Sequence, residues 1–306
     1  MKILHLGLCV QPAPFNGFQT AFIDELGAEN YAELNCGVPN FNEEAIKLFD
    51  SFKPDIVFIQ IQSENIIRHE TLKHFKGSTV INWTGDKRAT VPAWIVEAAP
   101  FVTITAFSNM DDVNYMRSLG YKSEYLEIGY DPLIYTPNGE ATPNVPDIVF
   151  MGNNYGRGYF PMSGFRIDCV DFLRSTYGER FGVYGMGWAY ANGNVNHSQR
   201  EEAALYRGSK IAINISHFDS LNYNSDRLLR ILGSGVACIS YNHKGMKQTY
   251  IDTVDYFNDF NQLKDKIDFY LENGYNRFNL ASRGNEFVKN NYTFKNQVEN
   301  IIKLAI

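Results

Sequence analysis

Two arginines lie one helical turn apart in the segment SDRLLRILGSGVACIS, residues 225–240. Asn224 and Ser225 precede the predicted helix, so the free backbone N–H groups of its first turn would face a bound anion. Arg227, in that first turn, can reach the same anion, although acidic residues are preferred at this end of a helix. A local conflict of this kind is typical of functional sites. We therefore interpret Arg227 as a phosphate ligand, with a partly solvated arginine as the alternative.

A glycine-rich turn offers a second place for a phosphate. In the segment FMGNNYGRGYF, Gly152 and Asn153 follow a predicted strand and Arg157 adds a fixed cation. Glycines allow close approach of the backbone to a phosphate, which the arginine would then neutralise. Asn16 and Gly17 follow the first strand, where the N–H groups of the next helix are also free for a ligand. The alternatives are a turn with a solvated arginine and, at Gly17, an ordinary turn and helix cap.

Asp86 is the candidate general base. It follows an apolar strand in INWTGDKRATVP, and a carboxylate at the carboxyl end of a parallel strand can take a proton from a substrate hydroxyl. A helix cap, or a salt bridge to Lys87 or Arg88, is the alternative. Those two cations, with Trp83 and Trp94, could line a substrate groove, for example around a flipped nucleobase. Core tryptophans beside a solvated basic turn are the competing interpretation.

No spacing in the sequence is typical of a metal site, and we expect none. The pairs Asp111–Asp112 and Asp252/Asp255 are interpreted as solvent-facing, and the six histidines have no ligand spacing. His217 follows a predicted strand beside the expected cleft, where it could be structural or functional. The cysteines lack a CxxC pair and are expected to be reduced, as in a cytoplasmic protein; they are Cys9, Cys36, Cys169 and Cys238.

The segments that must position these residues alternate between strand and helix signals. Such alternation predicts parallel sheets covered by helices on both faces. The predicted strands are residues 2–8, 55–61, 79–85, 101–107, 123–129, 147–152, 180–185, 210–216 and 236–240. The predicted helices are residues 19–26, 42–52, 64–75, 92–98, 110–119, 165–176, 200–206, 261–271, 275–291 and 293–304, besides the helix that contains Arg227.

The pattern divides the chain into two α/β domains with a cleft between them. Residues 131–146 contain four prolines and no periodicity, so they are predicted to form a linker. The expected domains are residues 1–130 and 147–292, each Rossmann-like, with the last helix, 293–306, assigned to the first domain. Ligands of parallel sheets bind beyond the carboxyl ends of the strands, which is where all the candidate residues lie.

Composition narrows the class of protein. The chain has 306 residues, 44% of them hydrophobic and 20% charged, as expected of a folded globular protein. Its net charge of −6 gives no bulk attraction to nucleic acid or anionic lipid. No run of about 18 apolar residues occurs, so no membrane span is expected. The N-terminal apolar run is too short for a signal peptide and is interpreted as a first strand.

The second half resembles the C-terminal domain of group 1-type glycosyltransferases, including the spore-maturation-type enzymes. The resemblance covers most of residues 147–302 and rests on segments that match in order: DIVFMGN, YRGSKIAINIS, NSDRLLRILGSGVACIS, DYFNDFNQLKDKIDFYLEN and RGNEFVKNNYTFKNQVENI. It implies the GT-B fold, which consists of two Rossmann-like domains with a nucleotide-sugar between them and no required metal. It also implies that the last helix crosses back onto the first domain.

The layout is also similar to that of phage DNA β-glucosyltransferases. In those enzymes a strand leads into an aspartate, a basic residue and a proline, as in INWTGDKRATVP. The resemblance implies that Asp86 is the catalytic base, which would invert the anomeric configuration. A front-face retaining mechanism is the alternative.

One residue departs from the family pattern. The helix usually reads Arg-x-x-Glu, and the glutamate binds the ribose of the donor. Arg227 matches the arginine, whereas Arg230 occupies the glutamate position and cannot accept hydrogen bonds from hydroxyl groups. Either Asp226 or Asp219 holds the ribose, or the donor differs from a standard UDP-sugar. Arg230 is retained as a donor-site residue without an assigned role.

The sequence therefore predicts a metal-independent glycosyltransferase that uses a nucleotide-sugar, UDP-linked, and an acceptor hydroxyl. The acceptor stays open between a glycan, a protein, a small molecule and a modified DNA base. A nucleotide-sugar epimerase and a non-catalytic nucleotide-binding protein are the rival classes.

Overall fold

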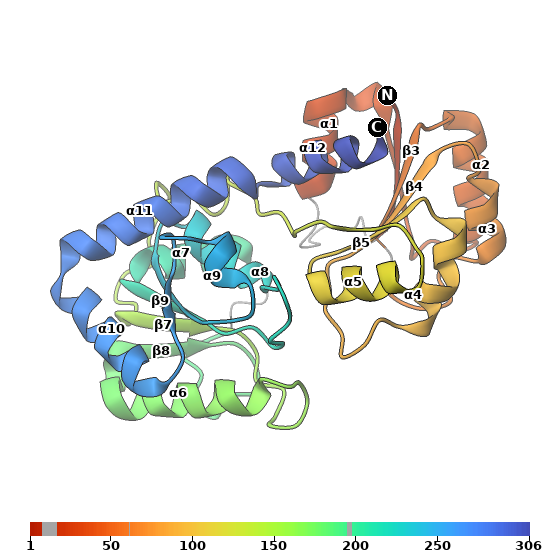
Figure 1. Ribbon diagram of the computed structural model, residues 1–306. Helices are drawn as coiled ribbons and strands as arrows, with labels where there is room; N and C mark the ends of the chain where they lie inside the picture. Colours follow the sequence, from red (N-terminus) through yellow and green to blue (C-terminus); the bar gives the residue numbers. More distant parts are fainter. Residues whose placement is uncertain (8–16, 61, 195–197) are drawn as a thin grey trace. The chain divides into compact units, whose positions relative to one another are not determined.

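The computed structural model describes residues 1–7, 17–60, 62–194 and 198–306. It divides into two compact units, Met1–Gly129 with Phe294–Ile306, and Tyr130–Thr293 (Figure 1). Cys9 and Asn16 lie outside the described residues.

The first unit contains a six-stranded sheet in the order β2-β1-β3-β4-β5-β6, with every pair of neighbours parallel. Its strands are β1 (Ile3–Gly7), β2 (Tyr31–Asn35), β3 (Ile56–Gln60), β4 (Thr79–Thr84), β5 (Ile104–Phe107) and β6 (Ser123–Tyr125). Its α-helices are α1 (Gly17–Leu26), α2 (Phe41–Phe52), α3 (His69–His74), α4 (Ala93–Ala98), α5 (Met110–Ser118) and α12 (Phe294–Ala305). The central strands are buried throughout, because helices cover both faces.

The C-terminal helix α12 belongs to the first unit, where it lies beside α1 (Figure 1). Phe294 and Val298 of α12 join a core on one face of the sheet that also holds Phe18 and Trp83. Gly17 begins α1 at a close contact, since a Cβ atom there would lie 1.9 Å from Cδ2 of Phe294. This packing gives the glycine a structural role, and its assignment to the donor site stays a prediction.

The second unit contains a five-stranded parallel sheet in the order β11-β10-β9-β7-β8. Its strands are β7 (Ile148–Met151), β8 (Phe181–Tyr184), β9 (Ile211–Asn214), β10 (Ala237–Tyr241) and β11 (Asp255–Phe257). Its α-helices are α6 (Ser163–Tyr177), α7 (Gln199–Gly208), α8 (Asp226–Gly233), α9 (Met246–Thr249), α10 (Phe260–Glu272) and α11 (Gly274–Asn291). The chain leaves β7 for β8 on one side and returns to β9 on the other, so a topological switch point lies between β7 and β9.

The predicted fold, two Rossmann-like domains with parallel sheets, is confirmed, while several elements differ from prediction, among them the short helix α9, which was not predicted. The edge strands β2 and β11 were not predicted, because half-buried YAELN and the three-residue DYF carry no strand-length apolar run. Helix α3 begins at His69 rather than at residue 64. The Asn42 side chain holds the preceding loop by donating to Ile66 O at 2.9 Å and accepting from Arg68 N at 2.9 Å.

Buried His5 makes the stability of the first unit depend on pH. Its Nε2 lies 2.5 Å from Oε1 of Gln60, and burial lowers its pKa to about 4, against about 6.5 in an unfolded chain. The contribution of neutral His5 to the free energy of unfolding is therefore fully present above pH 6.5 and is lost as the pH falls towards 4. Between about pH 7.5 and pH 5 we expect this residue to contribute a loss of about 2 kcal/mol in the free energy of unfolding.

Urea denaturation of the wild type and of His5→Gln at both pH values tests this expectation. His217 and His243 also have lowered pKa values, so the wild-type loss is larger than the share of His5. The variant should lose about 2 kcal/mol less than the wild type between the two pH values. An identical pH dependence in the two proteins would contradict the assignment.

Candidate functional site

The carboxyl ends of β7 and β9 hold the buried side chain of Arg227. The two strands pair in register only at Ile148–Ile211 and Val149–Ala212. Beyond that point the Arg227 guanidinium lies between them: its Nε donates to Met151 O and its Nη1 donates to Ile215 O at 3.0 Å. The side chain comes from the first turn of α8 and is 8% exposed. Arg227 is therefore fixed at the switch point of the sheet.

Arg166 is a second buried cation at the same place. It is 1% exposed, and its Nη2 donates to Asn153 O at 3.2 Å, while its Nη1 contacts the ring of His217. Both guanidinium groups lie over the Phe150 ring, with their Cζ atoms 5.3 Å (Arg166) and 5.1 Å (Arg227) from its centroid.

The two guanidinium groups meet over Gly152, directly after β7. A Cβ atom at this position would lie 2.7 Å from Nη2 of Arg227 and 2.9 Å from Nη2 of Arg166. Glycine is therefore required here for the arginines to approach the backbone and each other.

Within the part of the chain that the structure describes, neither Arg166 nor Arg227 forms an ion pair with a carboxylate. Their guanidinium groups donate to backbone carbonyl groups, and Arg166 also contacts the His217 ring. Burial, together with the neighbouring Arg227, lowers the pKa of Arg166 to about 8. Burial and the two arginines lower the pKa of His217 to about 2, so its ring is neutral. Two buried like charges are costly, and an anion bound between them would offset that cost.

The N-terminus of α8 adds further hydrogen-bond donors near the pair. Ser225 is the N-cap residue, yet its side chain caps no backbone N–H, and its buried Oγ has no hydrogen-bond partner among the described residues. The backbone N of Ser225 donates to Oγ of Ser216 at 3.2 Å, which fixes the start of the helix beside the end of β9. Asn224, 1% exposed, donates from Nδ2 to the Tyr250 hydroxyl at 3.3 Å. The first-turn N–H groups of α8 are thus left without a side-chain cap.

The structure brings together four of the sequence-predicted donor residues, Gly152, Asn153, Ser225 and Arg227, but not Arg157. Arg157 is exposed and pairs with Asp168 on α6, which corrects its assignment as the second cation. That place is taken by Arg166, which the sequence analysis missed. Its signal, like that of Arg227, was a basic residue near the start of a helix; α6 has no acidic residue in its first turn, whereas α8 has Asp226.

Arg230 has a structural explanation. Its guanidinium pairs with Oε2 of Glu202 at 3.0 Å and with Oδ2 of Asp226 at 2.5 Å, and it lies 5.6 Å from the centroid of the Tyr135 ring. Although burial opposes the charge, the two carboxylates raise the pKa of Arg230. The residue joins α8 to α7, and this correction removes it from the donor site.

Asp226 and Asp219 were the two candidates for binding the ribose of the donor, and Asp226 forms an ion pair with Arg230. Asp226 is engaged in that pair, whereas Asp219 lies in the loop after β9. Oδ1 of Asp219 accepts from Lys244 N at 2.9 Å. Asp219 also lies near two basic side chains, with Oδ1 3.6 Å from Nδ1 of His243 and Oδ2 4.0 Å from Nζ of Lys244. Both distances are longer than the 2.5 Å of the pair between Asp226 and Arg230, so Asp219 is the better placed of the two candidates.

Asp86 lies at the carboxyl end of β4 and is exposed. The loop around it is anchored on both sides. Gly85 O accepts from Oγ of Ser108 at 2.8 Å, and Nζ of Lys87 pairs with Oδ1 of Asp112 at 2.6 Å, both of the paired side chains being 8% exposed. The backbone that carries Asp86 is therefore held in one position.

The residues beside Asp86 stabilise this part of the fold. Nη2 of Arg88 donates to Gln62 O at 2.5 Å, and Lys87 is committed to its buried ion pair. Trp83 has no exposed surface, and its Nε1 donates to Leu126 O at 2.8 Å. A side chain without exposed surface cannot contact an acceptor, so the prediction for Trp83 is wrong and the core interpretation is correct.

No group of three or more His, Cys, Asp or Glu side chains is arranged to hold a metal ion within the part of the chain that the structure describes. Among the helices of the described ranges, none is both long and apolar enough to cross a bilayer.

Comparison with solved structures identifies the fold as GT-B. The chain is similar to OtsA in its apo form, with 10% identity, a TM-score of 0.68 and coverage of 99% of this chain and 98% of that one. It is similar to a glycosyltransferase from Rickettsia africae at 12% identity and a TM-score of 0.66, covering 99% and 97%. HepE from Anabaena, in complex with UDP, matches at 10% identity and a TM-score of 0.65, covering 99% of both chains.

Residues 166–303 match the family model described as "Glycosyl transferase-like". The match begins at Arg166 and includes most of α12. The resemblance to GT-B glycosyltransferases is thereby confirmed. A search of curated protein sequences finds no match.

Proposed function

We propose that this protein is a glycosyltransferase that moves a sugar from a nucleoside diphosphate sugar, UDP-linked, to an acceptor hydroxyl. The buried pair of Arg166 and Arg227 is the observation that carries the proposal. Two guanidinium groups over a glycine, without a carboxylate partner in the described part of the chain, match the charge and geometry of a diphosphate. HepE, a structural neighbour, has been solved with UDP and with UDP-glucose, which supports a UDP-linked donor.

The proposed donor site uses residues of the second unit alone. Arg166, Arg227 and the first-turn N–H groups of α8 bind the two phosphates and stabilise the charge that develops on the leaving diphosphate. Gly152 leaves room for the phosphates, and Asp219 accepts hydrogen bonds from the ribose hydroxyls. These donors supply the positive charge, so no metal ion enters the proposed mechanism.

The proposed transfer uses Asp86 as general base. The acceptor hydroxyl gives its proton to the Asp86 carboxylate, and its oxygen attacks the anomeric carbon. The bond from that carbon to the diphosphate breaks, and the nucleoside diphosphate leaves with the electron pair. Attack opposite the leaving group inverts the configuration. In the front-face alternative, the departing phosphate oxygen takes the proton and configuration is retained.

Turnover with a panel of nucleoside diphosphate sugars tests the proposed activity. Each donor is incubated alone and with a mixture of oligosaccharides, and both the released nucleoside diphosphate and the sugar of the remaining donor are analysed. We expect release of the nucleoside diphosphate only when an acceptor is present, and no change in the sugar of the remaining donor. A new sugar epimer from donor alone would indicate an epimerase, and binding without release under any condition would indicate a non-catalytic protein.

A further inference from the structure

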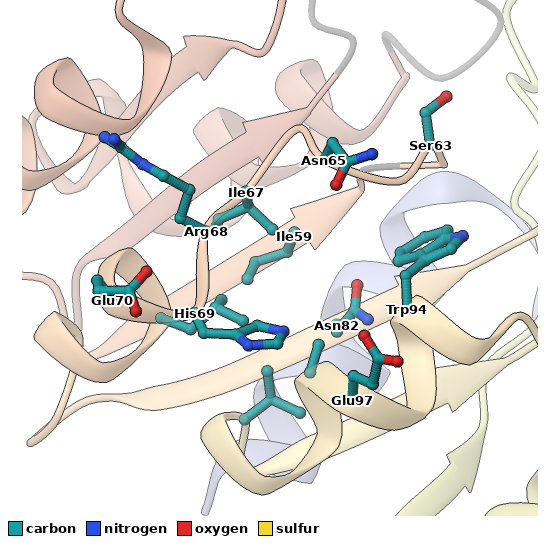
Figure 2. Close-up of a pocket in the computed structure, with 13 residues that line it drawn as sticks. Ile59, Ser63, Asn65, Ile67, Arg68, His69, Glu70, Asn82, Trp94 and Glu97 are labelled. Atoms are coloured by element: carbon teal, nitrogen blue, oxygen red, sulfur yellow. The ribbon is translucent and has the colours of Figure 1, made fainter.

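A cavity of about 430 Å³ lies over the carboxyl halves of β3 and β4 in the first unit, between α3 and α4 (Figure 2). Its volume is within the range of about 300–1,000 Å³ that is typical of small-molecule sites. Of the residues that the sequence predicted for a substrate groove, Trp94 lines it, and the pocket is built entirely from the first unit.

The floor of the pocket contains the side-chain amide of Asn82. Asn82 and Ile59 lie side by side in register on β4 and β3. Asn82 is only 5% exposed, and its side chain points into the pocket in Figure 2. Its carboxamide makes no hydrogen bond with the residues that the structure describes, although most buried polar groups in proteins are paired. Thr105, the register neighbour of Asn82 on β5, likewise has a buried hydroxyl without a partner.

The walls carry an aromatic ring and a carboxylate. Trp94 and Glu97 are one turn apart on α4, so both face the same side of that helix. Both line the pocket, with the Glu97 carboxylate beside Asn82 in Figure 2. His69 of α3 lines the opposite wall, with its ring packed 5.0 Å from the centroid of Phe101.

These groups fit a neutral ring that carries several hydroxyls. An aromatic face packs against the C–H groups of a pyranose ring. A carboxylate accepts hydrogen bonds from hydroxyls, whereas an amide both donates and accepts, so together they match vicinal hydroxyl pairs. We propose that this pocket binds a neutral saccharide unit, with Trp94, Glu97 and Asn82 as its contacts.

The local charge excludes the competing ligand classes. Glu70 and Glu97 both line the pocket, and the cation that lines it, Arg68, is paired with Glu43 at 2.5 Å. An anionic ligand would meet uncompensated carboxylates there. Nucleic acids bind through cations that neutralise their phosphates, and this pocket offers no such surface.

The saccharide is the acceptor in this scheme, a step that rests on the proposed function. Arg88 ties the loop that carries Asp86 to Gln62, the residue that precedes Ser63 on the pocket wall. Arg88 thus links the loop that carries Asp86 to one wall of the pocket.

Binding of defined saccharides to the full chain tests the pocket directly. The probes are glucose and N-acetylglucosamine, followed by saturation-transfer NMR, and a printed array of neutral and acidic oligosaccharides. Asn82→Leu and Glu97→Gln should each weaken binding of a neutral saccharide at least about tenfold, the effect of losing a hydrogen bond to a charged or buried group. Glu64→Gln is the matched control for Glu97→Gln, because Glu64 is an exposed glutamate of the same unit that does not line the pocket.

Two further readouts separate this inference from the proposed function. Asn82→Leu should fold with an unchanged or raised Tm, since it removes an unpartnered buried amide, and both pocket variants should bind UDP as the wild type does. The protein could bind a saccharide, with weaker binding in both variants, and yet turn over no nucleotide-sugar. That result would uphold the pocket and refute the proposed function. Three results, each in a protein that turns over the donor, would overturn the pocket. They are no saccharide binding, saccharide binding that neither variant changes, and binding of an oligonucleotide alone.

Discussion

Asp86→Asn is expected to lower kcat by about 10²- to 10⁴-fold, the range for loss of a general base, while the Kd for UDP stays unchanged. The amide has the size of the carboxylate but cannot take the proton of the acceptor hydroxyl. The fixed loop around Asp86, held through Lys87 and Arg88, should keep the variant folded. Steady-state kinetics and calorimetric titration with UDP measure the two quantities separately.

Asp24→Asn provides the control for Asp86, because Asp24 is an exposed aspartate on α1 of the same unit. It should match the wild type in both kcat and UDP affinity. Wild-type turnover in Asp86→Asn would remove this residue from the mechanism. The front-face retaining route would then be the one to test, by analysing the configuration of the product.

Arg166→Met is expected to weaken UDP binding and to stabilise the ligand-free protein. Hydrogen bonds to charged groups contribute about 1.5–3 kcal/mol, which corresponds to a Kd about 10- to 150-fold higher. In the absence of ligand, the same substitution removes a buried charge from the vicinity of Arg227, and the lowered pKa of Arg166 shows that this charge is disfavoured there. The Tm of the free protein should therefore rise. Weaker UDP binding together with a higher Tm of the ligand-free protein is expected of a residue whose role is to bind an anion.

Arg157→Met is the matched control for Arg166→Met. Arg157 is an exposed arginine, and its ion pair with Asp168 lies on the surface. Exposed pairs contribute about 0–1 kcal/mol, so the variant should have a wild-type Kd for UDP and a Tm that is unchanged or slightly lower. If Arg166→Met lowered the Tm and left UDP affinity intact, Arg166 would be a structural residue.

The periodicity of the sequence predicted most of the strands and helices but few of the partners of the site residues. Strand-length apolar runs marked the buried strands, whereas the edge strand β2 is half-buried and carries no such run. In β4 every residue from Val80 to Thr84 is buried. Asn82 and Thr84 fall on one face of this strand and Trp83 on the other. Because both faces are buried, the alternation could not show which face borders a pocket.

The candidate site depends on contacts that are distant in sequence. Arg227 could be found from local rules, because a cation in the first turn of a helix conflicts with the helix dipole. Arg166 meets it only because α6 and α8 both begin at the switch point of the sheet. Arg230 could not be explained without Glu202, which is on another helix. The sequence therefore indicated the anion site and one of its two buried cations, while the fold supplied the other.

Thermal unfolding of the wild type against a panel of nucleosides and nucleoside diphosphates tests the diphosphate site most directly. A ligand at a hundred times its Kd stabilises the folded state by about 2.7 kcal/mol, enough for a clear rise in Tm. A rise with a nucleoside diphosphate, absent with the parent nucleoside and reduced in Arg166→Met, is the expected result. An unchanged Tm with every nucleoside diphosphate would contradict the assignment of Arg166 and Arg227 to a donor site.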